Sequence, residues 1–294
     1  MRFSDCVRGT LTLTDGAWGT EFQRLGAELG ECTDEWNLTK PHFVRQIAES
    51  YVAAGSSVIL TNTFRANPIS LAHYGLQNQC AAINRAGVQA SRQAAANRAM
   101  VFASVGPSGK MLLTKDVTRE QLREAFSQQV AALAAEHPDA ILIETMTDID
   151  EACAAAVAAV ETGLPVIVSF VFDSGKNKDR TMMGATPEQV SAALVPGGVH
   201  AIGANCGVGI RESISVCERL AAASSLPIWI KPNAGLPELI GGVPTYKTSP
   251  EQFAASAQEL REAGATFLGG CCGSTPEFIR ALARQPALQS GAHA

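Results

Sequence analysis

Short apolar segments recur along the 294-residue chain, and amphipathic stretches separate them. The apolar segments are rich in β-branched residues and are mostly too short to be helices, so the pattern predicts strands. Eight strands are expected, at residues 11–15, 57–64, 101–107, 140–146, 165–172, 199–206, 227–234 and 266–272. Their nearly continuous apolar character is typical of a parallel sheet that is covered by helices.

The stretches between the strands carry clear helix signals. Thr118, Thr186 and Ser249 are each followed three residues later by Gln, which is the capping-box pattern at a helix start. Apolar positions then recur at helical spacing. Such faces are expected over residues 125–135, 151–160 and 253–263.

Strand and helix alternate about eight times, and this favours a single (β/α)₈ barrel of the α/β class. An open doubly wound sheet is the alternative, but no G-x-G-x-x-G motif follows the first strand. We therefore predict one domain over residues 1–294, with residues 285–294 as a disordered tail.

Composition narrows the function classes. The net charge is −5, and no run of basic residues is long enough to indicate binding to nucleic acid or to an anionic membrane. No apolar segment approaches the ~18 residues of a membrane span. The amino terminus lacks the apolar region of a secretory signal, and the eight cysteines are scattered along the chain. We expect a cytoplasmic protein with reduced thiols.

Polar side chains stand at or just after the carboxyl ends of at least five predicted strands. This is the face on which barrel active sites are built, and several buried polar residues there are hard to attribute to packing. The residues are Asp15, Thr61 to Thr63, Glu144, Asn205, Cys206, Lys231, Asn233, Cys271 and Cys272.

Three of these residues are a candidate metal site. Cys206 ends the sixth strand, and the adjacent Cys271 and Cys272 end the eighth, roughly 10 Å away. Flanking glycines would let both neighbouring thiols turn to one side. Three thiolates leave a tetrahedral Zn²⁺ with one open position, which is the catalytic form of such a site. Asn233 could supply a labile oxygen ligand.

The other interpretation treats the cysteines as small buried hydrophobic residues. We expect that role for the remaining five cysteines, at positions 6, 32, 80, 153 and 217. For Cys206, Cys271 and Cys272 the residues alone leave both interpretations open.

Six motifs together resemble the homocysteine S-methyltransferase family. They are DGAWGT (15–20), TNTF-x-AN (61–67), ETM (144–146), GANCG (203–207), KPNAG (231–235) and GGCCGSTPEFI (269–279). The resemblance covers about residues 10–283 and is closest to the homocysteine-binding module of cobalamin-dependent methionine synthase.

The resemblance implies a zinc-dependent barrel that methylates the sulfur of homocysteine to give methionine. Cys206, Cys271 and Cys272 match the zinc ligands of the family. Asp15 and Glu144 match acidic positions that contact the amino group of homocysteine. Further substrate contacts are expected from Gly16, Thr63, Asn205 and Asn233. Zinc would deprotonate the substrate thiol, so no histidine is assigned a catalytic role.

The methyl donor stays open. We expect either a small sulfonium or ammonium compound or a corrinoid protein acting in trans, because the sequence, which ends at residue 294, leaves no room for folate or cobalamin domains. Trp18 departs from the family; packing is favoured over cation–π binding of a cationic donor. Residues 173–184 are expected to form a mobile loop rather than a lid.

Three other functions are retained. A close variant acts on another thiol or on a corrinoid protein. A lyase or aldolase on the same barrel would need a Schiff-base lysine, for which Lys231 is the one candidate. A non-enzymatic zinc-binding module is the third, although an open fourth position argues against it.

Overall fold

The computed structural model describes residues 2–7, 11–240 and 243–285 and is a closed parallel barrel. Eight strands are hydrogen-bonded in the order β1-β10-β7-β6-β5-β4-β3-β2. A parallel bridge between Thr14 and Val58 joins the two ends of this sheet. The strands are β1 Thr12–Leu13, β2 Val58–Leu60, β3 Met100–Val105, β4 Ala140–Met146, β5 Val166–Phe170, β6 Ala201–Cys206, β7 Ile228–Pro232 and β10 Ala265–Leu268. The predicted (β/α)₈ fold is confirmed.

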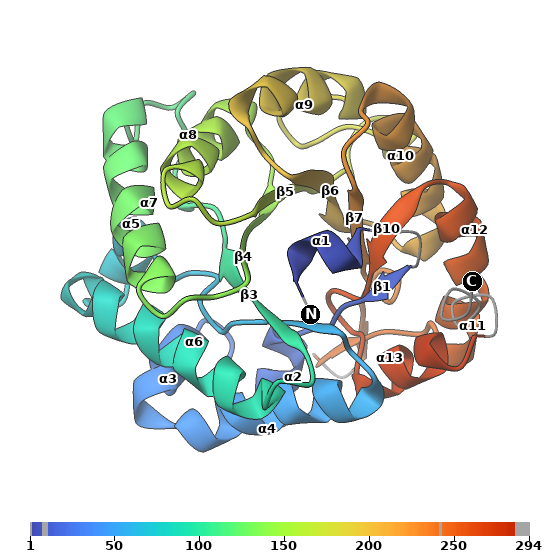
Figure 1. The fold of residues 1–294 in the computed structure, drawn as a ribbon, viewed down its shortest axis with the longest axis horizontal. Coiled ribbons are helices and arrows are strands. Elements are labelled where there is room, and N and C mark those ends of the chain that lie inside the picture. Colours follow the sequence, from blue (N-terminus) through green and yellow to red (C-terminus); the bar gives the residue numbers. More distant parts are fainter. Residues whose placement is uncertain (1, 8–10, 241–242, 286–294) are drawn as a thin grey trace.

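Helices surround the strands, as Figure 1 shows in a view along the barrel. The longer ones are α4 Pro41–Ala54, α6 Cys80–Ala95, α7 Arg119–Ala134, α8 Ile149–Val160, α9 Pro187–Leu194, α10 Ile210–Ala223 and α13 Pro276–Ala283. The shorter ones are α1 Phe3–Cys6, α2 Gly19–Arg24, α3 Trp36–Thr39, α5 Pro68–Ala72, α11 Pro250–Ala255 and α12 Ala257–Glu262. The capping boxes predicted at Thr118, Thr186 and Ser249 are present.

Most strands are shorter than predicted, chiefly at their carboxyl ends. β4 has the predicted bounds, but β2 ends at Leu60 and β10 at Leu268. Some ladder-like backbone bonds continue past these ends, for example from Thr61 N–H to the Phe102 carbonyl oxygen at 3.2 Å, while the Thr61 hydroxyl lies 2.6 Å from Thr63 Oγ1.

Two features were not predicted from the sequence. A small antiparallel hairpin, β8 Glu238–Ile240 with β9 Val243–Thr245, follows β7. The helix expected over 253–263 breaks at Ser256 into α11 and α12, and this break leaves both Phe253 and Leu260 buried. The predicted tail lies outside the described residues except for Gln285.

The barrel interior has an apolar lower layer and a polar upper layer. Near the amino ends of the strands, inward side chains form one apolar cluster that includes Phe102, Leu142, Ile167, Trp229 and Phe267. Helix α1 lies across this end of the barrel, where the Phe3 ring stacks on Phe267 with the centroids 6.0 Å apart (Figure 1).

Two residues further along each of four strands, the same inward direction carries polar groups. These buried residues are Ser104, Glu144, Ser169 and Lys231. None of the helices in the described ranges has both the length and the apolarity needed to cross a bilayer.

Candidate active site

Three cysteine sulfurs converge at the carboxyl end of the barrel. The Sγ atoms of Cys206, Cys271 and Cys272 all lie within 4.8 Å of one another. Cys206 is the last residue of β6, and the other two lie in the turn that follows β10. The spacing of the sulfurs and their donor type fit a tetrahedral metal site with thiolate ligands.

Close backbone approaches explain the two glycines before the cysteine pair. A Cβ atom at Gly269 would lie 2.0 Å from Thr14 Oγ1, and one at Gly270 would lie 2.2 Å from Ser274 Oγ. Only glycine fits such contacts without a shift of the neighbouring chain. The backbone therefore leaves strand geometry after Leu268, and both thiols turn toward Cys206.

The three thiols share protons unequally. Hydrogen bonds from Cys206 and Cys271 lower the pKa of Cys272, whereas hydrogen bonding to its two neighbours, followed by burial, raises the pKa of Cys206. The lowered pKa of Cys272 favours a thiolate in the cluster, which attracts a cation, and binding a metal there would release the remaining protons.

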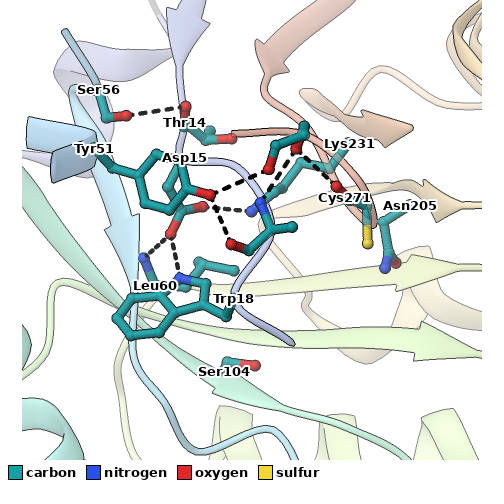
Figure 2. A network of polar contacts seen from close by, with 12 residues as sticks. Thr14, Asp15, Trp18, Tyr51, Ser56, Leu60, Ser104, Asn205, Lys231 and Cys271 are labelled. Carbon is teal, nitrogen blue, oxygen red and sulfur yellow. Dashed lines mark hydrogen bonds and ion pairs between the residues drawn. The ribbon is translucent and has the colours of Figure 1, made fainter. Parts of the chain in front are cut away.

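A buried ion pair lies beside the cysteines. The Lys231 ammonium bonds to Asp15 Oδ1, and Asp15 Oδ2 accepts hydrogen bonds from the Leu60 backbone N–H and from Trp18 Nε1, each at 2.7 Å (Figure 2). Burial alone would lower the pKa of Lys231, but the carboxylates of Asp15 and Glu144 outweigh it and raise that pKa.

The protonated state of Lys231 bears on the lyase alternative. A Schiff-base lysine must lose its proton before it attacks a carbonyl. In this barrel Lys231 is instead charged and ion-paired, which disfavours that chemistry.

Glu144 is the second buried carboxyl group of the site. Its Oε1 accepts a hydrogen bond from Ser104 Oγ at 2.5 Å. Burial raises the pKa of Glu144 to about 7, while the Lys231 ammonium acts in the opposite direction. The group therefore changes its charge close to neutral pH.

A cavity of about 410 Å³ connects these groups. It extends from the three cysteines past Glu144 and Lys231 to a second region walled by Trp18, Phe22, Phe64, Asp34 and Arg65. The volume lies in the usual range of small-molecule sites. The barrel mouth therefore combines a thiol cluster, a charged wall and an aromatic wall in one space.

Comparison with known proteins identifies the family. Residues 12–285 match the sequence profile described as homocysteine S-methyltransferase. The chain belongs to the homocysteine S-methyltransferase family.

The match to named relatives covers a part of each relative. The chain is 29% identical over 286 residues to methionine synthase of Mycobacterium leprae, covering 92% of this chain and 24% of that protein. It is 28% identical to methionine synthase of Mycobacterium tuberculosis, covering 95% of this chain and 25% of that protein. The chain thus spans about a quarter of the length of these curated relatives.

Solved structures agree on the fold. The metallated form of the homocysteine methyltransferase MmuM from Escherichia coli superposes with a TM-score of 0.80 at 24% identity, covering 96% of this chain and 99% of that one. Its oxidized form gives a TM-score of 0.79 at 25% identity, with 96% and 98% covered.

In this family member, the sequence-predicted substrate residues occupy different environments. Gly16 lines the cavity, and a Cβ there would lie 2.7 Å from the Tyr51 hydroxyl. Thr63 does not line it: the residue is fully buried, and its Oγ1 donates to the Ser104 carbonyl oxygen at 2.7 Å. Asn205 likewise lies outside the cavity wall and bonds to neighbouring strands.

Asn233 has one bonded and one unbonded end. Its Nδ2 donates to the Gly207 carbonyl oxygen at 2.7 Å, whereas its buried Oδ1 has no hydrogen-bond partner. An unpaired buried oxygen next to the strand of Cys206 fits the expected role of a weak oxygen ligand.

Several site residues were missed by sequence reasoning. Ser104, Thr145, Asp34 and Arg65 all line the cavity. For Ser104 a signal existed, since it continues the inward period of two on β3. The contacts of Asp34 and Arg65, whose backbone N–H donates to Asp34 Oδ1 at 2.9 Å, depend on loop geometry and left no comparable signal.

The remaining predictions can be placed. All eight cysteines are reduced thiols; Cys6, Cys32, Cys80 and Cys217 are buried, and Cys153 is half-buried. The Trp18 ring packs on Phe22 with the centroids 6.0 Å apart, in keeping with a packing role. The loop at 173–184 folds back on itself through Ser174 and Arg180, and it does not line the cavity.

Proposed function

We propose that this chain transfers a methyl group to the sulfur of homocysteine and so produces methionine. The observation that carries the proposal is the convergence of three cysteine sulfurs in a cavity at the barrel mouth. Membership of the homocysteine S-methyltransferase family supports it. The substrates are small molecules, and the metal we assign is zinc.

Cys206, Cys271 and Cys272 would hold the zinc ion. Soft sulfur ligands select zinc over magnesium or calcium. When bound, zinc supplies a Lewis-acid position at which a substrate thiol is deprotonated at neutral pH. The unpaired Asn233 Oδ1 would fill that position weakly before substrate arrives.

The charged wall of the cavity would orient the amino-acid end of homocysteine. Glu144 faces the cavity and receives the substrate ammonium group. Asp15 already has three donors on its carboxylate, so it contributes negative charge to this region and keeps Lys231 in place. Holding both ends of the substrate aligns its sulfur for an in-line displacement at the donor methyl group.

The donor is a small methylated sulfonium or ammonium compound, or a methylcorrinoid carried by a partner protein. The partly exposed rings of Trp18 and Phe64 in the cavity wall give a methylated cation a favourable surface. This part of the proposal is tested by a panel of S-methylmethionine, S-adenosylmethionine, betaine and methylcobalamin, each supplied with homocysteine.

Metal analysis and calorimetry test the proposal as a whole. Purified protein is expected to hold about one zinc per chain and to bind homocysteine. Cys206→Ala should lose both properties, whereas Cys217→Ala, which removes a buried thiol remote from the cluster, should lose neither. Full zinc retention by Cys206→Ala would contradict the three-ligand site. Absence of homocysteine binding to the zinc-loaded protein would contradict the proposed acceptor.

A further inference from the structure

One backbone conformation in the cavity wall is unusual. Thr145 follows Glu144 in β4 and has a φ angle of +64°. A β-branched residue is strongly disfavoured in this left-handed region. The pairing of β4 with β5 shifts register between Ile143 and Met146, so the strand bends where the Glu144 side chain enters the cavity.

The side chain of Asn205 accounts for this conformation. Its Oδ1 accepts the Thr145 backbone N–H at 2.8 Å, and its Nδ2 donates to Thr145 Oγ1 at 2.7 Å. Ser169 Oγ on the intervening strand β5 also donates to Asn205 Oδ1, at 2.7 Å. The amide is therefore hydrogen-bonded to both the backbone and the side chain of Thr145, and Ser169 on β5 fixes its orientation.

Asn205 also lies between the cysteine cluster and the Glu144 side of the cavity. The next residue in the chain is Cys206, which itself has a φ angle of +58°. The Asn205 amide thus connects the strand that carries a cysteine of the metal cluster with the strand that carries Glu144. Asn205 itself does not line the cavity, so it acts on the cavity wall through Thr145.

We propose that Asn205 is a positioning residue: it holds Thr145 in the left-handed conformation and thereby directs the Glu144 carboxylate into the cavity. The inference rests on the proposed function for the role of Glu144 as the partner of the substrate ammonium group. Its structural half, the dependence of Thr145 on Asn205, stands on the geometry alone.

The first test is Asn205→Ala, measured in the zinc-loaded enzyme with the donor that the panel identifies. We expect KM for homocysteine to rise by about 10- to 100-fold, by analogy with the effect of removing a residue that orients a metal ligand. The kcat and the zinc content should change little, because the cysteines and the donor region remain. A variant whose kcat falls while KM is unchanged would overturn the assignment.

A matched pair of second substitutions tests the backbone argument. Thr145→Gly and Thr145→Ala both remove the hydroxyl group. Of the two, only glycine readily adopts a positive φ without the stabilising hydrogen bonds from Asn205. In the Asn205→Ala background, Thr145→Gly should recover most of the lost homocysteine affinity and raise the unfolding temperature. Thr145→Ala should do neither. Equal behaviour of the two double variants would overturn the proposal.

The two possible failures are distinguishable. If the zinc-loaded wild-type protein does not bind homocysteine in calorimetry, the proposed function fails. The unfolding temperatures of the four proteins, measured without metal or substrate, still decide whether Asn205 holds Thr145. If Asn205→Ala does not fold well enough for kinetics, the comparison of the glycine and alanine double variants carries the test.

Discussion

The two layers of the barrel interior are built on the same strands and differ in almost every other respect. Below, Phe102, Leu142 and Trp229 pack with Phe267 and are covered by α1. Two residues further along, the same strands carry Ser104, Glu144 and Lys231. Side-chain direction is identical in the two layers, and residue chemistry alone changes.

The difference teaches how a barrel separates stability from chemistry. The lower layer needs only volume and apolarity, so its contacts are interchangeable to a degree. In the upper layer each buried polar group needs a specific partner, because an unpaired one is costly. Substitutions in the lower layer should therefore change the free energy of unfolding, whereas those above should change binding and catalysis as well.

The largest difference should come from removing one cysteine in each layer. Cys271→Ala removes a metal ligand and should lower activity by roughly 1,000-fold or more, since such a metal supplies several kcal/mol of stabilisation to the reaction. Cys6→Ala removes a buried thiol from the lower cluster and should leave activity and zinc content unchanged. Zinc analysis and initial rates check both variants. Comparable activity losses in the two would contradict the idea that the lower layer serves stability and the upper layer serves chemistry.

The next largest effect is expected at Trp229. Trp229→Ala should lower the free energy of unfolding by about 3–5 kcal/mol, because it empties the centre of the apolar layer. Trp229→Phe is the matched control: it keeps an aromatic ring and removes an indole N–H that is buried without a partner. Denaturant unfolding should find the phenylalanine variant much closer to wild type, with zinc binding retained by both.

Lys231→Met tests how much the buried ion pair of the polar layer contributes to the free energy of unfolding. Removing the ammonium group leaves Asp15 buried and without its counter-charge, and we expect a loss of about 3 kcal/mol or more. Adding Asp15→Asn should recover part of this loss, because the amide oxygen still accepts hydrogen bonds while the charge is gone. Chemical unfolding of the single and double variants measures both effects. If the double variant recovers no stability, the unpaired charge of Asp15 is not the cause of the loss.

The smallest effect is a dependence of stability on pH. The pKa of Glu144, about 7 in the folded metal-free protein, lies above its ordinary value of 4.5, so the folded state binds the extra proton. The stabilisation is complete below pH 4.5 and is lost as pH rises through 7, by up to about 3 kcal/mol. Glu144→Gln should reduce this dependence of the free energy of unfolding on pH. Glu124→Gln, at an exposed position, should leave it unchanged.

Sequence reasoning reached the strand-end residues but not their partners. The convergence of the three cysteines was predictable because the carboxyl ends of the strands meet at one face, whereas their residue type alone left a structural role open as well. The bonds of Asp15 to Lys231, of Glu144 to Ser104 and of Asn205 to Thr145 were not predictable. They join strands far apart in the sequence, and they depend on strand tilt and on the register shift in β4.

Thr63 shows that a sequence motif also cannot indicate which of its side chains face the cavity. It belongs to a motif of the family and follows a predicted strand, so a substrate contact was a natural expectation. Its hydroxyl group instead bonds to Thr61 and to the Ser104 backbone behind the cavity wall. A motif identifies a segment of an active site, but the twist of the segment decides which of its side chains face inward.

Asp15 follows the shortest strand of the barrel, next to the place where the first strand meets the second. Within the described residues, the bridge of Thr14 to Val58 joins these two strands, next to a hydrogen bond from the Ser57 N–H to the Leu13 carbonyl oxygen at 2.8 Å. Beyond it, the Asp15 carboxylate accepts the Leu60 backbone N–H, as a strand carbonyl would in a longer ladder. The Asp15 carboxylate thus also closes the barrel between β1 and β2. A bound cationic group that draws on its charge should weaken the bond to the Leu60 N–H, and faster hydrogen exchange at the Leu60 amide would record the binding.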